Sequence, residues 1–379
     1  MTVVRTIIAV AIATLLVAPA LADNHRPAAL AALAALASPP IPADNRMSDE
    51  KVELGKLLFF DPILSGNYGM PCSACHLPEA GWAIQDRISF GYPGTTHWRN
   101  SQTIVNSAYY SKLFWAGSSK SLESQARSAA RGGVAGNGED DMMEARLAFV
   151  PEYRRRFAEV FGDDWPNVRH AYMAIAAFER TIVQTDTPFD DYMRGDDDAL
   201  TEQQKRGLTL FAGQANCVAC HNGPLLSDEQ YYNLGVPPYG GWEEDELAQI
   251  TFRFELYAKG STEALYRHTK DDPGLYFRAK DKRHKGLFRT PSLRYTQYTY
   301  PYMHNGMLES LRDVVEFYNA GGGVNEFAET KSPLVQPLGL SDADIDDLVA
   351  FLESLSGDEI LMEAPDLPVM EPLPAVVGN

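Results

Sequence analysis

The positions of hydrophobic and polar residues along the chain predict helices much more often than strands. The segment SDEKVELGKLLFFDPILS, residues 48–65, places its leucines on one face of a helix. The segment NVRHAYMAIAAFERTIVQ, residues 167–184, is apolar enough to predict a buried helix. Strand patterns are few. We therefore predict a mainly α fold with long loops.

The segment LSDADIDDLVAFLESLSG, residues 340–357, carries signals for both ends of a helix. Ser341 is a favourable N-cap, and acidic residues fill the first turn. Gly357 follows the last apolar position, as is common where a helix ends. This segment is therefore predicted to be a helix.

All four cysteines lie in two short motifs, CSACH and CVACH. Four cysteines in an exported protein ordinarily suggest two disulfides, and paired Cys-x-x-Cys motifs also occur in zinc sites. Here a histidine follows each pair directly, although the chain has only 8 histidines in 379 residues. The pattern C-x-x-C-H is typical of a covalent c-type haem, in which two thioether bonds hold the porphyrin and the imidazole ligates the iron. Two such haems are predicted, one at Cys72, Cys75 and His76 and the other at Cys217, Cys220 and His221.

The chain also contains a partial internal repeat. Gly207 and Phe211 precede the second motif in the way that Gly55 and Phe59 precede the first. This repeat predicts two related modules, each a helix that leads into a haem-attachment loop. The Pro- and Asp-rich stretch TDTPFDDYMRGDDDA places the boundary between them near residue 190. The predicted parts are a signal peptide at 1–22, an Ala/Pro-rich arm at 23–45, an N-terminal c-type haem domain at 46–190, a C-terminal c-type haem domain at 191–357 and a disordered, acidic and proline-rich tail at 358–379.

Residues 1–22 have the composition of a secretory signal. Arg5 is their only charge, an apolar run follows it, and ALA precedes Asp23 as a small-residue cleavage site. The apolar run is short for a membrane span, and no later segment is long and apolar enough to be one. We expect an exported protein without a membrane span, periplasmic if the source is Gram-negative. A retained N-terminal anchor is the alternative.

The chain is acidic, with a formal net charge of −18. Such a surface argues against binding to nucleic acid or to an anionic membrane, and it permits electrostatic steering of basic partners. Acidity of this kind most often serves only solubility.

The two haem motifs, about 145 residues apart, occur together with RNSQTIVNSAYYSKLFWAG and FRTPSLRYTQYTYPYMHNG. This combination resembles the bacterial di-haem cytochrome c peroxidase superfamily, which includes the MauG-like enzymes, over roughly residues 45–357. The resemblance implies two cytochrome c-like, mainly helical haem domains with a calcium ion between them. It also implies that His76 and His221 are the proximal ligands of the two irons.

The resemblance bears on the second axial ligand of the C-terminal haem. In the peroxidases proper, a methionine lies fourteen residues after the histidine of the PY-x-H-x-G loop. The same count from His304 reaches Tyr318, and the MauG-like branch has a tyrosine ligand there. Tyr318 is therefore predicted to be the sixth ligand of that iron. The alternative is that Tyr318 only packs in a helix and that Met303 or Met307 is the ligand.

Exchanging methionine for tyrosine changes the redox chemistry of the iron. A thioether sulfur is soft, favours ferrous iron and raises the reduction potential, whereas a phenolate is hard and anionic and favours oxidised iron. A haem ligated by Tyr318 is therefore expected to accept electrons poorly from a mild donor and to hold oxidising equivalents.

Three further residues match catalytic positions of the superfamily. Trp115 corresponds to the tryptophan between the two haems, which can relay an electron, although a lone tryptophan is usually a core residue. Gln125 corresponds to a distal-pocket glutamine over the first haem. The distal acid that moves a proton between the peroxide oxygens is assigned to Glu139, with Asp140 behind it. This region departs from the pattern of the superfamily, and an acid in so acidic a stretch is ordinarily solvated.

In the peroxidases proper, a histidine can cap the first iron in the resting enzyme. The RNS segment aligns Tyr92 with that position, so the first haem is expected to be five-coordinate or to bind water. His97 as a cap is the alternative.

The resemblance also assigns calcium ligands. They are Asn100, Thr299 and Pro301, of which one contributes a side-chain oxygen and two contribute backbone carbonyls. Neutral oxygen atoms suit this hard ion, although binding without a carboxylate is weak.

Taken together, the resemblance implies an exported di-haem peroxidase that uses hydrogen peroxide to reach a high-valent di-haem state and oxidises a partner protein at long range. The first alternative is a cytochrome c peroxidase that reduces hydrogen peroxide with electrons from a small cytochrome or cupredoxin; Tyr318 argues against it. The second alternative is a non-catalytic di-haem electron-transfer protein, which would have two six-coordinate irons.

Overall fold

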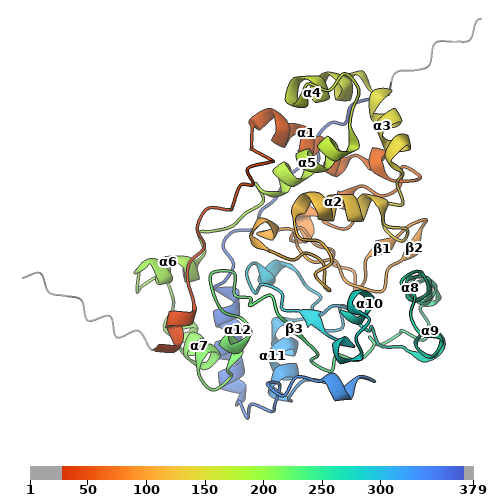
Figure 1. Cartoon of the computed structure of the whole chain (residues 1–379). Helices are drawn as coiled ribbons and strands as arrows, with labels where there is room; N and C mark the ends of the chain where they lie inside the picture. The colour runs from red at the N-terminus through yellow and green to blue at the C-terminus, as the bar shows by residue number, and fades with distance from the viewer. Residues whose placement is uncertain (1–27, 371–379) are drawn as a thin grey trace, which may run out of the picture.

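The computed structural model describes residues 28–370 (Figure 1). The predicted signal peptide and the first residues of the predicted arm lie outside this range. The α-helices of the described range are α1 (Asp49–Phe60), α2 (Leu122–Arg131), α3 (Asp140–Ala148), α4 (Pro151–Phe161), α5 (Val168–Glu179), α6 (Pro188–Arg194), α7 (Glu202–Ala212), α8 (Glu246–Ala258), α9 (Glu263–His268), α10 (Tyr276–Ala279), α11 (Leu311–Asn319) and α12 (Asp342–Glu353). The prediction of a mainly helical fold is confirmed.

Strands are few and short in the described residues. They form two antiparallel pairs, one of β1 (Phe90–Gly91) with β2 (Thr95–Thr96) and one of β3 (Tyr231–Tyr232) with β4 (Phe288–Arg289). Long loops connect the helices, and the haem motifs lie in loops that follow α1 and α7.

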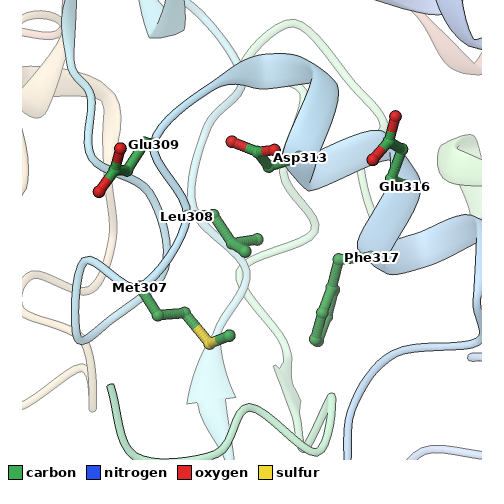
Figure 2. A pocket seen from close by; sticks show the side chains of 6 residues that line it. All are labelled: Met307, Leu308, Glu309, Asp313, Glu316 and Phe317. Carbon is green, nitrogen blue, oxygen red and sulfur yellow. The ribbon is translucent and has the colours of Figure 1, made fainter. Parts of the chain in front are cut away.

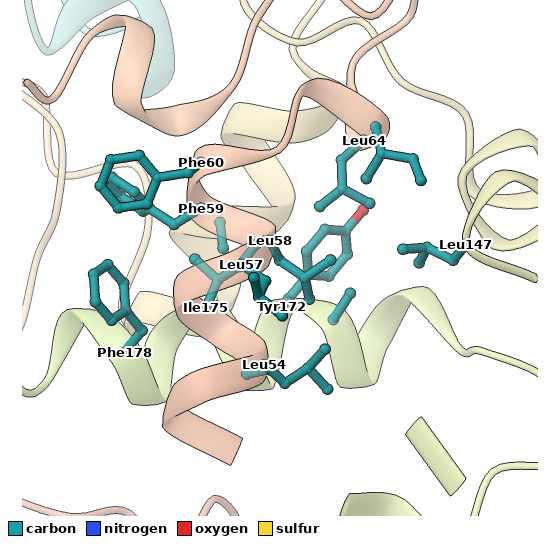
Figure 3. Close-up of a cluster of buried hydrophobic side chains, with 14 of the residues drawn as sticks. Leu54, Leu57, Leu58, Phe59, Phe60, Leu64, Leu147, Tyr172, Ile175 and Phe178 are labelled. Atoms are coloured by element: carbon teal, nitrogen blue, oxygen red, sulfur yellow. The ribbon is translucent and has the colours of Figure 1, made fainter. Parts of the chain in front are cut away.

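Helices α1 and α5 cross in close contact at a glycine. A Cβ atom on Gly55 would lie 1.9 Å from the carbonyl oxygen of Ala174 and 2.9 Å from the Cβ of Phe178. Only hydrogen fits there, so the glycine lets the two helix backbones touch. The aromatic side chains of Phe59 and Phe178 pack beside this crossing, with ring centroids 5.3 Å apart (Figure 3).

Helices α7 and α12 repeat this crossing in the second half of the chain. A Cβ atom on Gly207 would lie 2.0 Å from the carbonyl oxygen of Asp347 and 2.7 Å from the Cβ of Phe351. Phe211 packs against Phe351 with ring centroids 5.1 Å apart. The echo between the two halves of the sequence therefore corresponds to the same helix crossing made twice, each beside a Cys-x-x-Cys-His turn.

Each crossing belongs to its own hydrophobic cluster. The first cluster is built mainly from α1, α3, α4 and α5 and includes Ile182 (Figure 3). The second is built mainly from α7 and α12 and includes Phe189. The chain thus passes from one cluster to the other between Ile182 and Phe189. The exact domain boundary near residue 190 stays a prediction.

The ends of the described chain pack against these clusters. Leu30 and Leu33, from the predicted arm, are buried in the second cluster. At the other end, Ile360 and Met362 pack against the first cluster, and the indole of Trp82 donates a hydrogen bond of 2.7 Å to the carbonyl of Ile360. The segment 358–362 was predicted to belong to a disordered tail. It is packed instead, because its apolar side chains contact the first cluster, whose residues come mainly from the N-terminal half of the chain.

A fully buried ion pair ties the second cluster to the loop after β4. Arg294 and Asp190 are 1% and 0% exposed, and their charged groups lie 2.8 Å apart. The Arg294 guanidinium also donates to the carbonyl of Pro224 at 2.6 Å, so it anchors the segment that follows the second haem motif. Removing either partner of such a pair leaves a buried charge unpaired, which typically lowers the free energy of unfolding by about 3–5 kcal/mol.

In the described part of the chain, no helix has the length and apolar character needed to cross a membrane.

The glycine crossing generates a prediction about stability. Gly55→Ala should lower the free energy of unfolding, because the overpacking cost of about 1–3 kcal/mol outweighs the gain of about 1 kcal/mol in helix propensity. Urea denaturation followed by circular dichroism measures the change. Gly240→Ala is the control, since a Cβ there meets no atom within 4 Å. A Gly55→Ala variant as stable as the parent would contradict the close crossing.

Candidate functional site

The first attachment turn is the 3-10 helix η3 (Cys72–Ala74), which lies in the loop after α1. The backbone N–H groups of Cys75 and His76 both donate to the carbonyl of Cys72, at 3.2 and 3.1 Å. The Nδ1 atom of His76 lies 3.2 Å from the carbonyl oxygen of Trp82. Because a carbonyl only accepts, Nδ1 carries the hydrogen and Nε2 keeps its lone pair. Burial lowers the pKa of His76 to about 4, so the imidazole is neutral.

The second attachment turn, η6 (Cys217–Ala219), has the same construction. The N–H groups of Cys220 and His221 donate to the carbonyl of Cys217 at 3.2 and 2.9 Å. The His221 Nδ1 lies 3.0 Å from the carbonyl oxygen of Leu226, which again leaves Nε2 as the free lone pair. Burial lowers the pKa of this imidazole as well.

The donor groups of both turns fit covalent haem better than zinc or disulfides. All four cysteines are free thiols. Burial raises the pKa of Cys72 and of Cys217 to about 12, so both are protonated thiols before any group is attached. In the described residues, no three His, Cys, Asp or Glu side chains are grouped as a zinc site requires. Each turn offers two thiols for thioether bonds and one neutral imidazole with a free Nε2, which is the set that a c-type haem uses.

Tyr318 lies on α11 beside the second turn. Burial raises the pKa of its phenol, and the charges of Cys217 and Cys220 raise it further. Val315 of α11 and Cys217 pack in the same hydrophobic cluster, so this helix lies on the side of the second attachment turn. The thioethers of attached haem carry no charge, and ferric iron near the phenol would favour the phenolate. The geometry is compatible with Tyr318 as an axial ligand.

The rival ligand Met307 is engaged elsewhere. It packs against a third hydrophobic cluster that includes Trp98 and Phe252, whereas Cys217 packs against the second cluster. Met303 occupies a tight turn with a φ of 72°, and its carbonyl accepts a hydrogen bond from Gly306.

Trp115 contacts segments that belong to both halves of the molecule. Its indole Nε1 donates to the carbonyl of Asn100 at 2.8 Å, and its own carbonyl accepts from the N–H of Arg289 at 2.9 Å. Its ring also meets the ring of His304 edge-on, with centroids 6.4 Å apart.

The two segments that hydrogen-bond Trp115, at Asn100 and at Arg289, also contact the two haem histidines. The backbone of Gln102 contacts the imidazole of His76, and the backbone of Pro291 contacts that of His221. Trp115 therefore lies between the two attachment sites, where a relay residue is needed. Its role as a relay is an inference from this position.

The residues assigned to the distal side of the first haem are less well placed. Gln125 lies on α2, and Glu139 is the N-cap residue of α3. The Glu139 side chain is 73% exposed, with its carboxylate 3.8 Å from the Arg131 guanidinium. Asp140 accepts a hydrogen bond from Arg131 with one oxygen, while its Oδ1 is buried without a partner among the described residues. The Asp140 side chain is nevertheless 43% exposed as a whole, and the identity of the distal acid, Glu139 or Asp140, stays a prediction.

His97 is poorly suited to cap the first iron. Its Nδ1 accepts a hydrogen bond of 3.1 Å from the N–H of Arg99, and its ring stacks on Trp98 with centroids 4.0 Å apart. Burial lowers the pKa of His97 to about 3, so the ring is neutral. A neutral imidazole that accepts at Nδ1 carries its hydrogen on Nε2 and has no lone pair left for iron. Tyr92, at the aligned position, donates its N–H to Val134.

The predicted calcium ligands lie in two neighbouring segments. The N–H of Asn100 donates to the carbonyl of His304 at 2.8 Å, which joins its loop to the segment that holds Thr299 and Pro301. No group of three or more His, Cys, Asp or Glu side chains in the described residues could hold a metal ion. Calcium at neutral oxygen atoms stays a prediction.

One residue that sequence reasoning missed is Asp272. It accepts hydrogen bonds from Arg99 at 2.6 and 2.9 Å and from the indole of Trp98 at 2.8 Å. Burial acts to raise the pKa of Asp272, but the Arg99 guanidinium lowers it below its usual range. This buried ion pair fixes the RNS loop, which includes Asn100 and therefore positions Trp115. No local pattern marks Asp272, because its partner lies far away in the sequence.

A surface pocket of about 520 Å³ lies beside α11 (Figure 2). Its apolar lining includes Phe317, whose ring meets that of Tyr318 edge-on with centroids 5.7 Å apart. Carboxylates surround this lining, and one of them, on Glu309, is 78% exposed. The complete lining is Met307, Leu308, Glu309, Asp313, Glu316 and Phe317. An acidic surface with an apolar centre therefore adjoins the second haem site.

Comparisons with known proteins agree with this construction. The family model for di-haem cytochrome c peroxidase matches residues 49–198. The chain is 56% identical to the cytochrome-c peroxidase IdrP1 of Denitromonas iodatirespirans over 87% of this chain and 88% of the relative. It is 33% identical to the methylamine utilization protein MauG of Methylorubrum extorquens over 87% of this chain and 85% of that protein.

Among solved structures, the fold is similar to that of a MauG-like protein associated with microbial copper homeostasis. The TM-score is 0.72 at 30% sequence identity, and the match covers 86% of this chain and 94% of that one. With two haem-attachment turns in place and relatives matched over most of their length, the chain belongs to the di-haem cytochrome c peroxidase family and is an oxidoreductase that acts on hydrogen peroxide.

Proposed function

We propose that the protein is a periplasmic peroxidase that reduces hydrogen peroxide with electrons from a small, basic redox protein. One observation carries the proposal: a relative that is 56% identical over 87% of the chain is a cytochrome-c peroxidase. The relatives therefore favour the ordinary peroxidase over long-range oxidation of a partner, which was the main expectation from Tyr318. The overall reaction consumes one peroxide, two electrons and two protons and yields two waters.

The chain divides this work between its two halves. Haem held at each Cys-x-x-Cys-His turn would supply the redox chemistry, and we assign the reaction with peroxide to the first half and the contact with the donor to the second. In this proposal Asp140, or Glu139 beside it, moves a proton between the peroxide oxygens and so promotes cleavage of the O–O bond. Trp115 lies between the sites and relays electrons from the second to the first. His76 and His221 would each hold one iron through Nε2.

The acidic pocket beside α11 supports a basic electron donor. Its exposed carboxylates attract lysine-rich surfaces, and its apolar centre offers desolvated contact close to Tyr318. The net charge of −18 extends this attraction beyond the pocket and raises the rate of encounter.

A second candidate function is retained because of Tyr318. A phenolate ligand would stabilise oxidised iron in the second haem, so the protein would store oxidising equivalents and withdraw electrons from a residue of a partner protein. This is the chemistry expected of a MauG-like enzyme, and the position of Tyr318 beside Cys217 and Cys220 supports it.

The test of the proposed function is a stopped-flow assay with a reduced, basic small cytochrome or cupredoxin. We expect repeated turnover, with two donors oxidised for each peroxide consumed. A protein that consumes peroxide once and leaves the donor reduced would contradict the ordinary peroxidase. If such a protein then oxidised a tryptophan on an added partner, the second function would be correct.

Reversing the charge of the pocket should weaken the donor reaction. Glu309→Lys combined with Glu316→Lys is expected to lower the association rate by about tenfold or more at low ionic strength. The difference should shrink at high salt, because exposed charges are screened. Glu263→Lys is the control, since this acid on α9 is 76% exposed and lies away from the pocket. Equal losses in both variants would argue against docking at α11.

Replacing the tyrosine should change the potential of the second haem. Tyr318→Met is expected to raise it, because a thioether favours ferrous iron and a phenolate does not. Optical spectroelectrochemistry resolves the two haems. Tyr257→Met is the matched control, since this tyrosine on α8 is 77% exposed. An unchanged second potential in Tyr318→Met would show that Tyr318 is not a ligand.

A further inference from the structure

Glu179, the last residue of α5, is an acid buried inside the first haem module. It is 3% exposed, and its Oε2 has no hydrogen-bond partner among the described residues. The adjacent Arg180 is 5% exposed, and its Nη1 has no partner there either. A buried carboxyl without full hydrogen bonding lowers the stability of the fold, so a protein that keeps one is expected to use it.

The neighbours of Glu179 place it at the first attachment turn. After burial, its charge is the largest cause of the raised pKa of Cys72, the residue that forms the first thioether. Phe178, which precedes Glu179, belongs to the hydrophobic cluster against which Cys72 packs. Its ring lies 6.1 Å from that of Trp82, the residue whose carbonyl holds Nδ1 of His76. The carboxyl therefore lies in the wall of the first haem site.

The charged groups around Glu179 do not neutralise it. Arg180 directs its Nη2 to Glu123 on α2, at 2.7 Å, instead of to Glu179. The same Glu123 oxygen accepts from the amide of Asn45, whose own oxygen accepts from Lys51 on α1 at 3.1 Å. The positive charges of Arg180 and Lys51 are thus committed to Glu123 and Asn45. This leaves Glu179 with an incomplete set of partners.

This arrangement keeps Glu179 protonated under ordinary conditions. Burial raises its pKa to about 8; Arg180 acts to lower the pKa and Glu123 to raise it. A carboxyl of this kind is neutral at neutral pH, and it ionises when positive charge appears nearby.

The second module provides an internal comparison. Gly55 meets Phe178 at the first helix crossing, as Gly207 meets Phe351 at the second. The residue after Phe178 is Glu179, and the residue after Phe351 is Leu352, which is buried in the second cluster. The same structural position thus holds an acid beside the first haem and a hydrocarbon beside the second.

We propose that Glu179 couples the redox state of the first haem to a proton, which it holds while the iron is ferrous and releases when the iron becomes ferric. Oxidation removes one electron from the iron and one proton from the Glu179 carboxyl to bulk water; reduction reverses both. The coupling keeps the net charge of the buried site unchanged and confines proton exchange to the module that cleaves peroxide. It rests on the proposed function only through the presence of haem at Cys72 and Cys75.

The sign of the effect follows from the charges. Ferric haem carries one more positive charge than ferrous haem, so it lowers the pKa of the nearby carboxyl. Between the two resulting pKa values, oxidation releases a proton, and the reduction potential of the first haem falls as pH rises. The second haem, beside Leu352, lacks this particular contribution.

The test is a spectroelectrochemical titration of the holoprotein at a series of pH values around about pH 8. In the parent, the potential of the first haem should fall with rising pH. In Glu179→Leu, which copies the second module, and in Glu179→Gln, which keeps the size and polarity, this fall should be lost. The second potential should follow the same pH dependence in all three proteins. An electrode replaces the donor, so the outcome does not depend on which donor the enzyme uses.

A second readout keeps the test decisive if Glu179→Leu fails to load haem. The ferric-minus-ferrous infrared difference spectrum of the parent should contain the C=O band of a protonated carboxyl, and Glu179→Gln should lose it. A first-haem potential with the same pH dependence in the parent and in Glu179→Gln, or an infrared band that survives the substitution, would overturn the proposal.

Discussion

The rest of the structure depends on two neutral imidazoles. A hydrogen bond to a backbone carbonyl fixes the orientation of each ring. The carbonyls of Trp82 and Leu226 hold Nδ1 of His76 and His221, and so leave Nε2 for iron. Each imidazole follows a Cys-x-x-Cys turn that is placed by a glycine crossing of two helices. The fold is therefore one cytochrome-like construction made twice, and each copy has the donor groups that a c-type haem requires.

The function arises from the differences between the two halves. The second half places a phenol, Tyr318, beside its cysteines and opens an acidic pocket to the surface next to that phenol. The first half has a buried acid, Glu179, where the second has Leu352. We therefore propose that one half exchanges electrons with a partner and that the other combines electrons with protons.

Much of the site could be predicted from the sequence because its signals are local. The Cys-x-x-Cys-His spacing and the helix that begins after Ser48 depend on near neighbours. Tyr318 is different, because only the resemblance to the superfamily assigned it and its ligand role stays a prediction. Long-range partners could not be predicted: nothing near Asp272 shows that it pairs with Arg99 across the fold. Composition was also misleading for the tail, which looks disordered but docks two apolar side chains in the first core. The distal acid was uncertain for the same reason, because burial of one carboxylate oxygen in an acidic loop is decided only by packing.

The central claim is that two similar haem modules have unlike iron environments. Electron paramagnetic resonance of the diferric holoprotein at low temperature tests it most directly, since each ferric haem gives its own signal. If the first iron lacks a strong sixth ligand and His221 and Tyr318 ligate the second, the account predicts one high-spin signal and one low-spin signal. Two low-spin signals in the resting protein, or two high-spin signals, would contradict it.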